Sequence, residues 1–280
     1  NGWLLSTCGI TILIDPLLEG PLDFGIPDLY QGKKRVIPSS GVAETLPPID
    51  CILLTQGLDD HAHVRTLQKL QKLDPTVPIV APLSAEGALR TSGFWKGGKA
   101  GIFRSQQSTP QVRFLKHQQT TIISPRKVEK EDGSTVTIRA TTGALVGPPW
   151  QRRENGYILQ GSSSSSKDGP SIYIEPHVEF NARELRKLGP VDIVISPISG
   201  QTLPAFELVH GCEETMRLME ILQPKFLVPM QNGDIDTEGP VAKFVSEVGS
   251  MQEFERRLSS SSLATKLVDV YPGKDIQIPL

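Results

Sequence analysis

Residues 53–63 read Leu-Leu-Thr-Gln-Gly-Leu-Asp-Asp-His-Ala-His, and this stretch decides how the rest of the chain is interpreted. It begins inside the apolar run 51–54, which is typical of a buried strand. It is followed by residues 64–73, where Val or Leu recurs every third residue, as on one face of a helix. The polar side chains therefore lie where a strand ends and a helix begins, a junction at which binding sites commonly form.

Short apolar runs bounded by turn residues recur along the chain and predict further strands, while helical spacing predicts helices. The predicted strands lie at 10–14, 51–54, 78–81, 120–123, 136–140, 156–160, 171–175, 192–196, 226–230, 268–270 and 276–278. The predicted helices lie at 64–73, 181–188, 213–222, 242–248 and 251–258. The charged segment 127–133 is interpreted as a hairpin tip and the serine tract 162–166 as a loop.

Strands joined as hairpins in each half, with helices after them, indicate two sheets packed face to face. We therefore predict an α/β fold, an αββα sandwich of two mixed β-sheets flanked by helices. No stretch reads as a linker, so residues 1–280 are expected to form a single domain. Residues 1–16 read as strand material with no initiator Met and no signal peptide, so we expect the N-terminal strand to be truncated.

Composition excludes several classes of protein. The 280 residues carry 29 Lys and Arg against 31 Asp and Glu, a formal net charge of −2, whereas a general nucleic-acid binder normally has a basic surface. No apolar run approaches the roughly 18 residues that a membrane-spanning helix needs. The 3 cysteines are odd in number and far apart in the sequence, so they do not indicate a disulfide framework.

The 53–63 stretch resembles the Thr-His-x-His-x-Asp-His signature of the metallo-β-lactamase superfamily, with Thr55, Asp60 and His61 retained. Residues 1–16 resemble the Asn-Ser-Trp-Leu … Leu-Ile-Asp-Pro opening of the branch related to the ascorbate-phosphate lactonase. Residues 171–177 and 226–233 resemble the later strands Ile-Tyr-Phe-x-Gly-Asp-Thr and Val-Ile-Pro-x-His-x-Gly. The resemblance spans nearly the whole chain and implies the metallo-β-lactamase fold.

Within the superfamily the chain is most similar to a plant and cyanobacterial branch that contains Gln-x-Leu-Asp-Asp-His and Glu-Pro-His. That similarity implies a chloroplast or other plastid location, and a removed transit peptide would account for the missing start. Otherwise we expect a soluble intracellular protein.

In the family, two histidines of the signature and a third on a later loop hold a first metal ion. At the corresponding positions this chain has Gln56, Leu58 and Leu145. Leucine has no lone pair to donate, so the first site cannot be formed from these residues. The resemblance therefore implies a degenerate metal site.

A second metal ion is held in the family by the Asp and last His of the signature, a late-strand His and a bridging Asp. The resemblance assigns these places to Asp60, His61, Gln231 and, in place of the bridging Asp, His177. They leave a site for one divalent ion, with Gln231 as a weak amide ligand. Zn²⁺ is the first expectation, with Mn or Fe as alternatives, and a protein without metal is equally compatible with the sequence.

Other polar residues around this set receive roles beside the ligands. Asp15 resembles a family position that orients a metal ligand, although it also fits a strand-end turn. Asp59 is interpreted as supporting the metal ligands without binding the ion itself, or as a helix cap. Glu175 precedes His177 by two residues, and on a strand both would point to one face. Glu175 and Asp60 are therefore the candidate catalytic residues, the alternative for Glu175 being a salt-bridged carboxylate.

Substrate contacts are expected from polar residues near the metal ligands and from the 143–157 loop. That loop takes the place of the one that carries the third histidine in the family. Trp150 would form an apolar wall, and Arg152 and Arg153 would face a small anionic substrate, unless they are simply solvated. Gln56 and His63 complete the candidate substrate-binding set, the alternative for His63 being a helix cap.

Two functions remain open. The first is a metal-dependent hydrolase of a phosphodiester, lactone or other ester, acting with one ion. The second is a catalytically inactive protein, a pseudoenzyme that keeps the fold for binding or assembly, as an oligomer or with a protein partner. Replacement of the bridging Asp by His177, another donor, favours the first, whereas the missing histidines favour the second.

Overall fold

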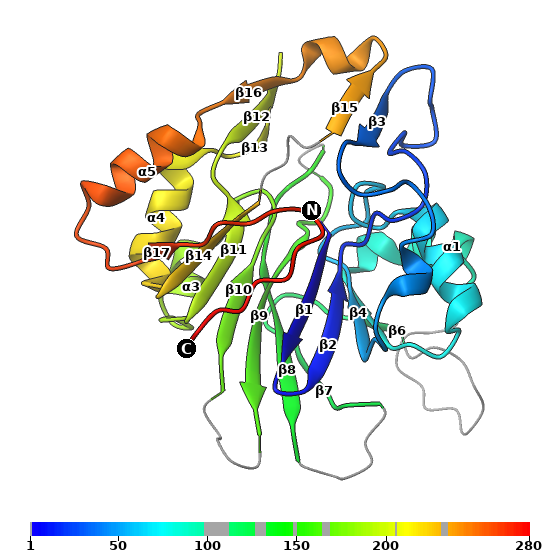
Figure 1. Ribbon diagram of the computed structural model, residues 1–280, viewed down its shortest axis with the longest axis horizontal. Coiled ribbons are helices and arrows are strands. Elements are labelled where there is room, and N and C mark those ends of the chain that lie inside the picture. The colour runs from blue at the N-terminus through cyan, green and yellow to red at the C-terminus, as the bar shows by residue number, and fades with distance from the viewer. Residues whose placement is uncertain are drawn as a thin grey trace.

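The computed structural model describes residues 2–97, 112–126, 133–147, 150–163, 169–204, 206–230 and 235–280 (Figure 1). The expected amide ligand Gln231 lies outside the described residues. So do most of the charged segment 127–133 and of the serine tract 162–166.

The first sheet is built by the N-terminal part of the chain and has the strand order β1-β2-β4-β5-β6. β1 and β2 form an antiparallel hairpin, and β2, β4, β5 and β6 are parallel to one another. The strands are β1 (Trp3–Thr7), β2 (Ile10–Ile14), β4 (Cys51–Leu53), β5 (Ile79–Ala81) and β6 (Val112–Phe114).

The second sheet has the order β17-β14-β11-β10-β9-β8-β7. It is antiparallel from β7 to β10 and parallel from β10 to β17. Its strands are β7 (Thr120–Ile123), β8 (Thr135–Thr142), β9 (Asn155–Ser162), β10 (Ser171–Ile174), β11 (Ile193–Pro197), β14 (Phe226–Met230) and β17 (Lys266–Leu267).

Two small sheets lie at one end of the sandwich. One has the order β13-β12-β16, and the other pairs β15 with β3 from the far end of the sequence (Figure 1). Their strands are β3 (Gln31–Lys34), β12 (Gly200–Leu203), β13 (Phe206–Val209), β15 (Ile235–Glu238) and β16 (Ser246–Val248). The 3-10 helices are η1 (Ala43–Thr45), η2 (Leu83–Ala85) and η3 (Val241–Phe244).

Helices cover the outer faces of both large sheets. α1 (Val64–Leu73) and α2 (Glu86–Thr91) pack on the first sheet, while α3 (Ala182–Leu185), α4 (Cys212–Leu222) and α5 (Met251–Ser259) lie beside the second (Figure 1). Between the sheets, alternate strand residues form one apolar core that joins Ile12 and Leu53 of the first sheet to Ile138 and Ile174 of the second. The predicted αββα sandwich is confirmed.

Two sequence predictions near the C-terminus are wrong. Residues 242–248 are not a helix, because Ser246–Val248 pairs with β12 as β16 and only Val241–Phe244 turns, as η3. Residues 268–270 and 276–278 are not strands, although Val268 and Ile278 pack against the core between the sheets. The short strand in this region is β17, two residues earlier, and the amide of Val268 donates to the carbonyl of Leu227 in β14 over 2.9 Å. The apolar pattern of 276–278 reflects burial alone.

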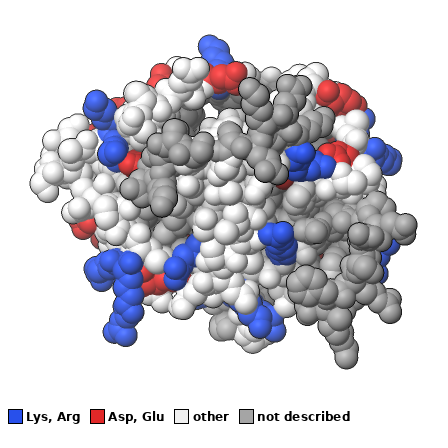
Figure 2. Space-filling view, turned by 90° about the horizontal axis from the view of Figure 1, so that it is seen from below, with Lys and Arg blue, Asp and Glu red and all other residues white. Residues whose placement is uncertain are grey.

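On the face shown in Figure 2, Lys and Arg lie in separate spots among uncharged and acidic residues. No helix in the described ranges is long and apolar enough to cross a membrane.

A buried hydrogen-bond chain joins the two large sheets. The Tyr157 hydroxyl on β9 donates to the Leu54 carbonyl just after β4 over 3.0 Å, and it accepts a hydrogen bond from Nδ2 of Asn155, also at 3.0 Å. The backbone amide of Asn155 donates to the carbonyl of Thr55 over 3.2 Å. The strand end that begins the 53–63 stretch is therefore fixed to the opposite sheet.

We expect Tyr157→Phe to lower the free energy of unfolding by about 1–3 kcal/mol, because the buried Leu54 carbonyl and Asn155 amide lose a partner. Urea denaturation followed by circular dichroism measures the change. Tyr271→Phe serves as the control, since Tyr271 is 58% exposed. Equal stability of Tyr157→Phe and the unchanged protein would contradict this role of the hydroxyl.

Candidate metal centre

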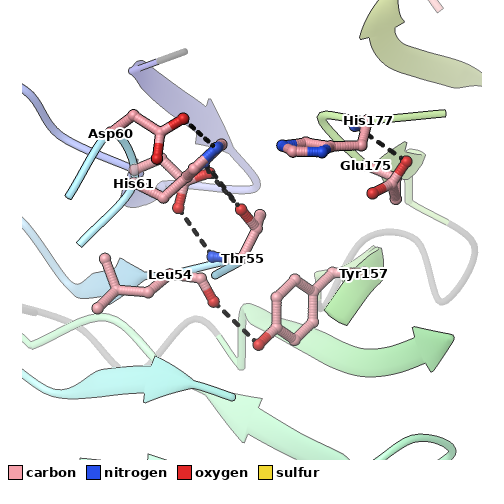
Figure 3. A network of polar contacts seen from close by, with 8 residues as sticks. Leu54, Thr55, Asp60, His61, Tyr157, Glu175 and His177 are labelled. Carbon is pink, nitrogen blue, oxygen red and sulfur yellow. Dashed lines mark hydrogen bonds and ion pairs between the residues drawn. The ribbon is translucent and has the colours of Figure 1, made fainter. Parts of the chain in front are cut away.

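Asp60, His61 and His177 come together between the two sheets. One ligand atom from each lies within 4.8 Å of the others, and the centroids of the two imidazoles are 5.7 Å apart with their planes tilted by 47°. Asp60 and His61 come from the loop before α1, and His177 follows β10; Figure 3 shows its ring turned toward the other two. Within the described residues, this is the one group of at least three His, Cys, Asp or Glu side chains spaced for a metal ion.

Asp15 fixes the ring of His61. It follows β2 in a left-handed conformation with φ of 42°, and its backbone amide donates to the carbonyl of Leu53 over 3.0 Å. One carboxylate oxygen accepts the amide of Thr55 at 2.8 Å, and the other accepts the Thr55 hydroxyl at 2.5 Å. That second oxygen also lies 2.8 Å from Nδ1 of His61.

This contact sets the tautomer of His61. An ionised carboxylate only accepts hydrogen bonds, so Nδ1 carries a proton and the neutral ring has its lone pair on Nε2. Nε2 is buried, lies 3.2 Å from Oδ2 of Asp60, and makes no hydrogen bond with any described residue. A carboxylate behind the imidazole and a free Nε2 in front of it is the arrangement that metal-binding histidines use.

Without an ion, the charges of the site hold a proton in the ion's place. Burial disfavours the imidazolium, but the charges of Asp60 and Asp15 outweigh it and raise the pKa of His61 to about 10. Burial alone would raise the pKa of Asp60, but the facing His61 charge lowers it to about 2. The Asp60 carboxylate is therefore ionised and can bind a cation.

His177 supplies a neutral imidazole. Burial, followed by the positive charge of His61, lowers its pKa to about 4. Its Nδ1 is buried and lacks a hydrogen-bond partner in the described part of the chain. Nδ1 of His177, Nε2 of His61 and the ionised carboxylate that Nε2 faces are donors that suit one divalent transition-metal ion.

Glu175 holds the backbone that carries His177. Its Oε2 accepts the amides of His177 at 3.1 Å and of Glu179 at 2.9 Å, and burial raises the pKa of this carboxyl to about 8. Figure 3 shows Glu175 on the side of His177 away from Asp60 and His61. The expectation that Glu175 and His177 share a strand face is wrong, because β10 ends at Ile174 and the chain turns after it.

The residues at the family's first-metal positions do not form a site. Gln56 is fully buried, and neither Oε1 nor Nε2 of its amide has a partner among the residues described. Leu58 is 37% exposed, and Leu145 donates its backbone amide to Glu179 over 2.9 Å. That the first metal site is lost stays a prediction, which rests on the missing lone pair of leucine.

The 56–58 loop is packed tightly against η2. A Cβ added to Gly57 would lie 2.4 Å from both the carbonyl carbon and the carbonyl oxygen of Ser84. The Ser84 hydroxyl donates to the Glu154 carboxylate, and burial raises the pKa of Glu154. The hydrogen bond holds η2 to the residue before β9, and the 56–58 loop packs against η2.

His63 and Asp59 support the start of α1. The Thr66 hydroxyl accepts the backbone amides of Leu18 at 2.8 Å and of Glu19 at 3.0 Å, so its single proton is donated to Nδ1 of His63 at 2.8 Å. Oδ1 of Asp59 lies 3.4 Å from the amide of Val64 at the first turn of the helix. The substrate contact expected of His63 stays a prediction.

The residues expected to bind an anion lie at the surface. Trp150 is 83% exposed and Arg152 is exposed. Arg153 pairs with Glu179 and donates to the carbonyl of Gly143 over 3.2 Å. No hydrogen bond or ion pair in the described structure joins these three side chains to the metal group, and their contact with substrate stays a prediction.

Several residues that shape the site were not predicted from the sequence, notably Tyr157, Glu154 and Ser84. Each acts through a partner more than 60 positions away, so no local pattern identifies it. The role of the Thr55 side chain was within reach, because it belongs to the signature and directly follows the strand.

We expect Gly57→Ala to destabilise the protein by about 1–3 kcal/mol, because the added methyl group overlaps the Ser84 backbone. Gly87 in α2 is the matched control: nothing lies within 4 Å of a Cβ added there. Gly87→Ala should raise the stability by about 0.4–1 kcal/mol. Thermal and urea unfolding compare the variants; a Gly57→Ala protein as stable as Gly87→Ala would show that the loop is free to move.

Comparison with known proteins gives one family and a shared fold. Residues 1–231 match the Beta-lactamase superfamily domain. The isothiocyanate hydrolase from Delia radicum gut bacteria aligns with a TM-score of 0.63 and 16% identity over 99% of this chain and 95% of that chain. Unliganded yeast PDE1 aligns with a TM-score of 0.47 and 9% identity over 78% of this chain and 66% of that chain. The short form of human tRNase Z aligns with a TM-score of 0.45 and 10% identity over 82% of this chain and 85% of that chain.

No curated protein matches the sequence, and at these identities the likeness to solved structures shows the fold alone. The family match, however, covers residues 1–231 of the 280 and agrees with the two-sheet architecture. The chain therefore belongs to the beta-lactamase superfamily and has the metallo-β-lactamase fold.

Proposed function

We propose that this protein is a hydrolase that works with a single divalent metal ion held by Asp60, His61 and His177. The observation that carries the proposal is the convergence of their ligand atoms within 4.8 Å, with Nε2 of His61 facing Oδ2 of Asp60 and Nδ1 of His177 buried and unpartnered among the described residues. The substrate class is a phosphodiester, a lactone or another ester. The similar fold of the isothiocyanate hydrolase supports a hydrolytic reaction on this fold.

A bound ion would supply Lewis acidity, which activates water and polarises a carbonyl or phosphoryl oxygen. Zn²⁺ suits two imidazoles and a carboxylate, and Mn or Fe would also be accepted. Gln231, which follows Met230 in the sequence, is proposed as a fourth, weaker ligand.

The chain's own residues orient these ligands and the substrate. Asp15 keeps the Nδ1 proton of His61 in place, so that Nε2 stays available. Glu175 has a positioning role, because its carboxylate holds the backbone of His177. The buried amide of Gln56 offers the substrate one donor and one acceptor that no described residue uses.

Other parts of the proposal rest on the sequence resemblance. Trp150, Arg152 and Arg153 are proposed to contact substrate at the rim, although Arg153 must first leave Glu179. The ascorbate-phosphate-lactonase-like branch, the plant type, a plastid location and a single domain over 1–280 are proposed on the same ground.

We expect the protein, loaded with Zn²⁺ and dialysed, to retain about one equivalent of zinc. His61→Ala and His177→Ala should each reduce bound zinc to the level of the buffer, because each removes a nitrogen ligand. Elemental analysis by mass spectrometry measures the zinc, and circular dichroism checks that the variants are folded.

His210→Ala is the matched control, since His210 pairs with Glu207 at the surface and should leave the zinc content unchanged. Loading is repeated with Mn²⁺ and Fe²⁺. Folded protein that retains none of the three ions would overturn the proposed centre and leave the inactive binding protein.

We expect Asp15→Asn to weaken zinc affinity by about 10–100-fold without abolishing binding, because the partner of His61 Nδ1 loses its charge. Competition with a zinc-binding dye measures the affinity. Asp59→Asn is the control, since Asp59 lies in the same motif but contacts only the first turn of α1. An equal loss in both variants would contradict a specific role for Asp15.

Hydrolysis is tested with bis-p-nitrophenyl phosphate, p-nitrophenyl acetate and a γ-lactone. Turnover of at least one of them that requires the ion and disappears in His177→Ala supports the proposal. A zinc-loaded protein that turns over none of these substrates would exclude the three proposed classes.

A further inference from the structure

A closed surface loop lies between residues 22 and 32. Its ends are joined by two reciprocal backbone hydrogen bonds, from Leu22 N to Gly32 O at 2.9 Å and from Gly32 N to Leu22 O at 2.7 Å. Compact loops with paired ends are frequently functional. The hydrolase function proposed above involves no residue of this loop.

The loop is anchored to the helix that follows the metal ligands. Asp23 is buried and forms an ion pair with Arg65 in the first turn of α1. A Cβ added to Gly20 would lie 3.0 Å from the guanidinium of the same Arg65. Because α1 begins at Val64, just after Asp60 and His61, this anchor holds the loop next to the metal group.

Phe24 is presented to solvent by a strained turn. Its φ is 50°, a left-handed conformation that a bulky aromatic residue rarely adopts. The turn is held by Asp23, whose side chain accepts the amide of Gly25 at 3.0 Å and whose carbonyl accepts the amide of Ile26 at 2.8 Å. The Phe24 side chain is nevertheless 47% exposed, so packing in the core does not explain the strain.

Phe24 and Tyr30 form an aromatic pair on this loop. Their ring centroids are 5.6 Å apart with the planes tilted by 55°. Tyr30 is half-buried, and burial, followed by the negative charge of Asp60, raises the pKa of its hydroxyl. Tyr30 is thus the inner ring of the pair, and the exposed Phe24 is the outer one.

The loop itself offers no cation to an anionic group. Residues 22–32 contain two Asp and neither Lys nor Arg. The neighbouring cation Arg65 is already paired with Asp23. Within the 53–63 stretch, Leu58 is an exposed apolar side chain.

We propose that Phe24 and Tyr30 form a substrate-binding wall, and that the substrate carries a flat, uncharged apolar group that lies on it while its scissile bond reaches the metal centre. This inference rests on the proposed hydrolase and narrows its substrate class to esters with an aromatic-sized substituent. The αL turn at Phe24 holds the ring outward before substrate arrives, which reduces the entropy lost on binding.

The test compares two probes with the same metal-binding head group, acetohydroxamate and benzohydroxamate, by calorimetry on the zinc-loaded protein. We expect benzohydroxamate to bind about tenfold more tightly, because its ring is removed from water on the aromatic pair. Phe24→Asn should reduce that preference at least about fivefold and leave acetohydroxamate unchanged, since asparagine tolerates the left-handed turn. Tyr30→Leu should reduce it as well.

Tyr271→Ala is the control, because it removes an exposed ring that contacts Lys274 and is not part of the Phe24–Tyr30 pair. Melting temperatures confirm that each variant is folded. An unchanged preference in both Phe24→Asn and Tyr30→Leu would overturn the wall.

Benzamide, which lacks the chelating pair of oxygens, separates this inference from the proposed function. It is titrated without zinc and followed by saturation-transfer NMR. If neither hydroxamate binds, the metal centre fails, and the wall stands only if benzamide binding depends on Phe24.

Discussion

The carboxylate of Asp15 is the constraint on which the candidate site depends. It lies at the end of β2 in a left-handed conformation, and its two oxygens bind the amide and hydroxyl of Thr55 at the end of β4. The oxygen that accepts the Thr55 hydroxyl also accepts Nδ1 of His61. One side chain thus fixes the ends of two parallel strands and the tautomer of an imidazole. Because the group is buried, none of these contacts is weakened by competition with water.

Local sequence patterns predicted helices and strands correctly where the structure of a segment depends on the spacing of its own apolar residues. The helix at 64–73 and the strands at 120–123 and 226–230 are found with the predicted bounds. The prediction for 242–248 is wrong, because the pairing of its second half with β12 is a contact between distant residues. The apolar residues near the C-terminus show a second limit, since Ile278 packs on the core outside any strand. Apolar spacing predicts which residues are buried and does not specify which backbone they pair with.

The same distinction applies to the metal group. Asp60 and His61 follow β4, and His177 follows β10; the resemblance to the family assigned these three to one metal site, and their ligand atoms do meet. The role of Glu175 was not predictable, because it depends on where β10 ends and on how the chain turns beyond it. Arg153 was interpreted as free to bind an anion, yet it pairs with a carboxylate 26 positions away. Ion pairs between distant loops leave no periodic signal in a sequence.

The buried polar atoms of the site favour a ligand there. A buried polar group without a hydrogen bond costs about 1–3 kcal/mol, and a domain is stable by only about 5–15 kcal/mol. The amide of Gln56 and Nδ1 of His177 are buried without partners among the described residues, and Nε2 of His61 faces the carboxylate of Asp60. A site with no function would be more stable if apolar side chains took these places, as apolar residues fill the core between the sheets. The resemblance to the family assigns Gln56 to the place of a metal-binding histidine, and the chain keeps a buried amide there at a cost that an ion or a substrate would remove.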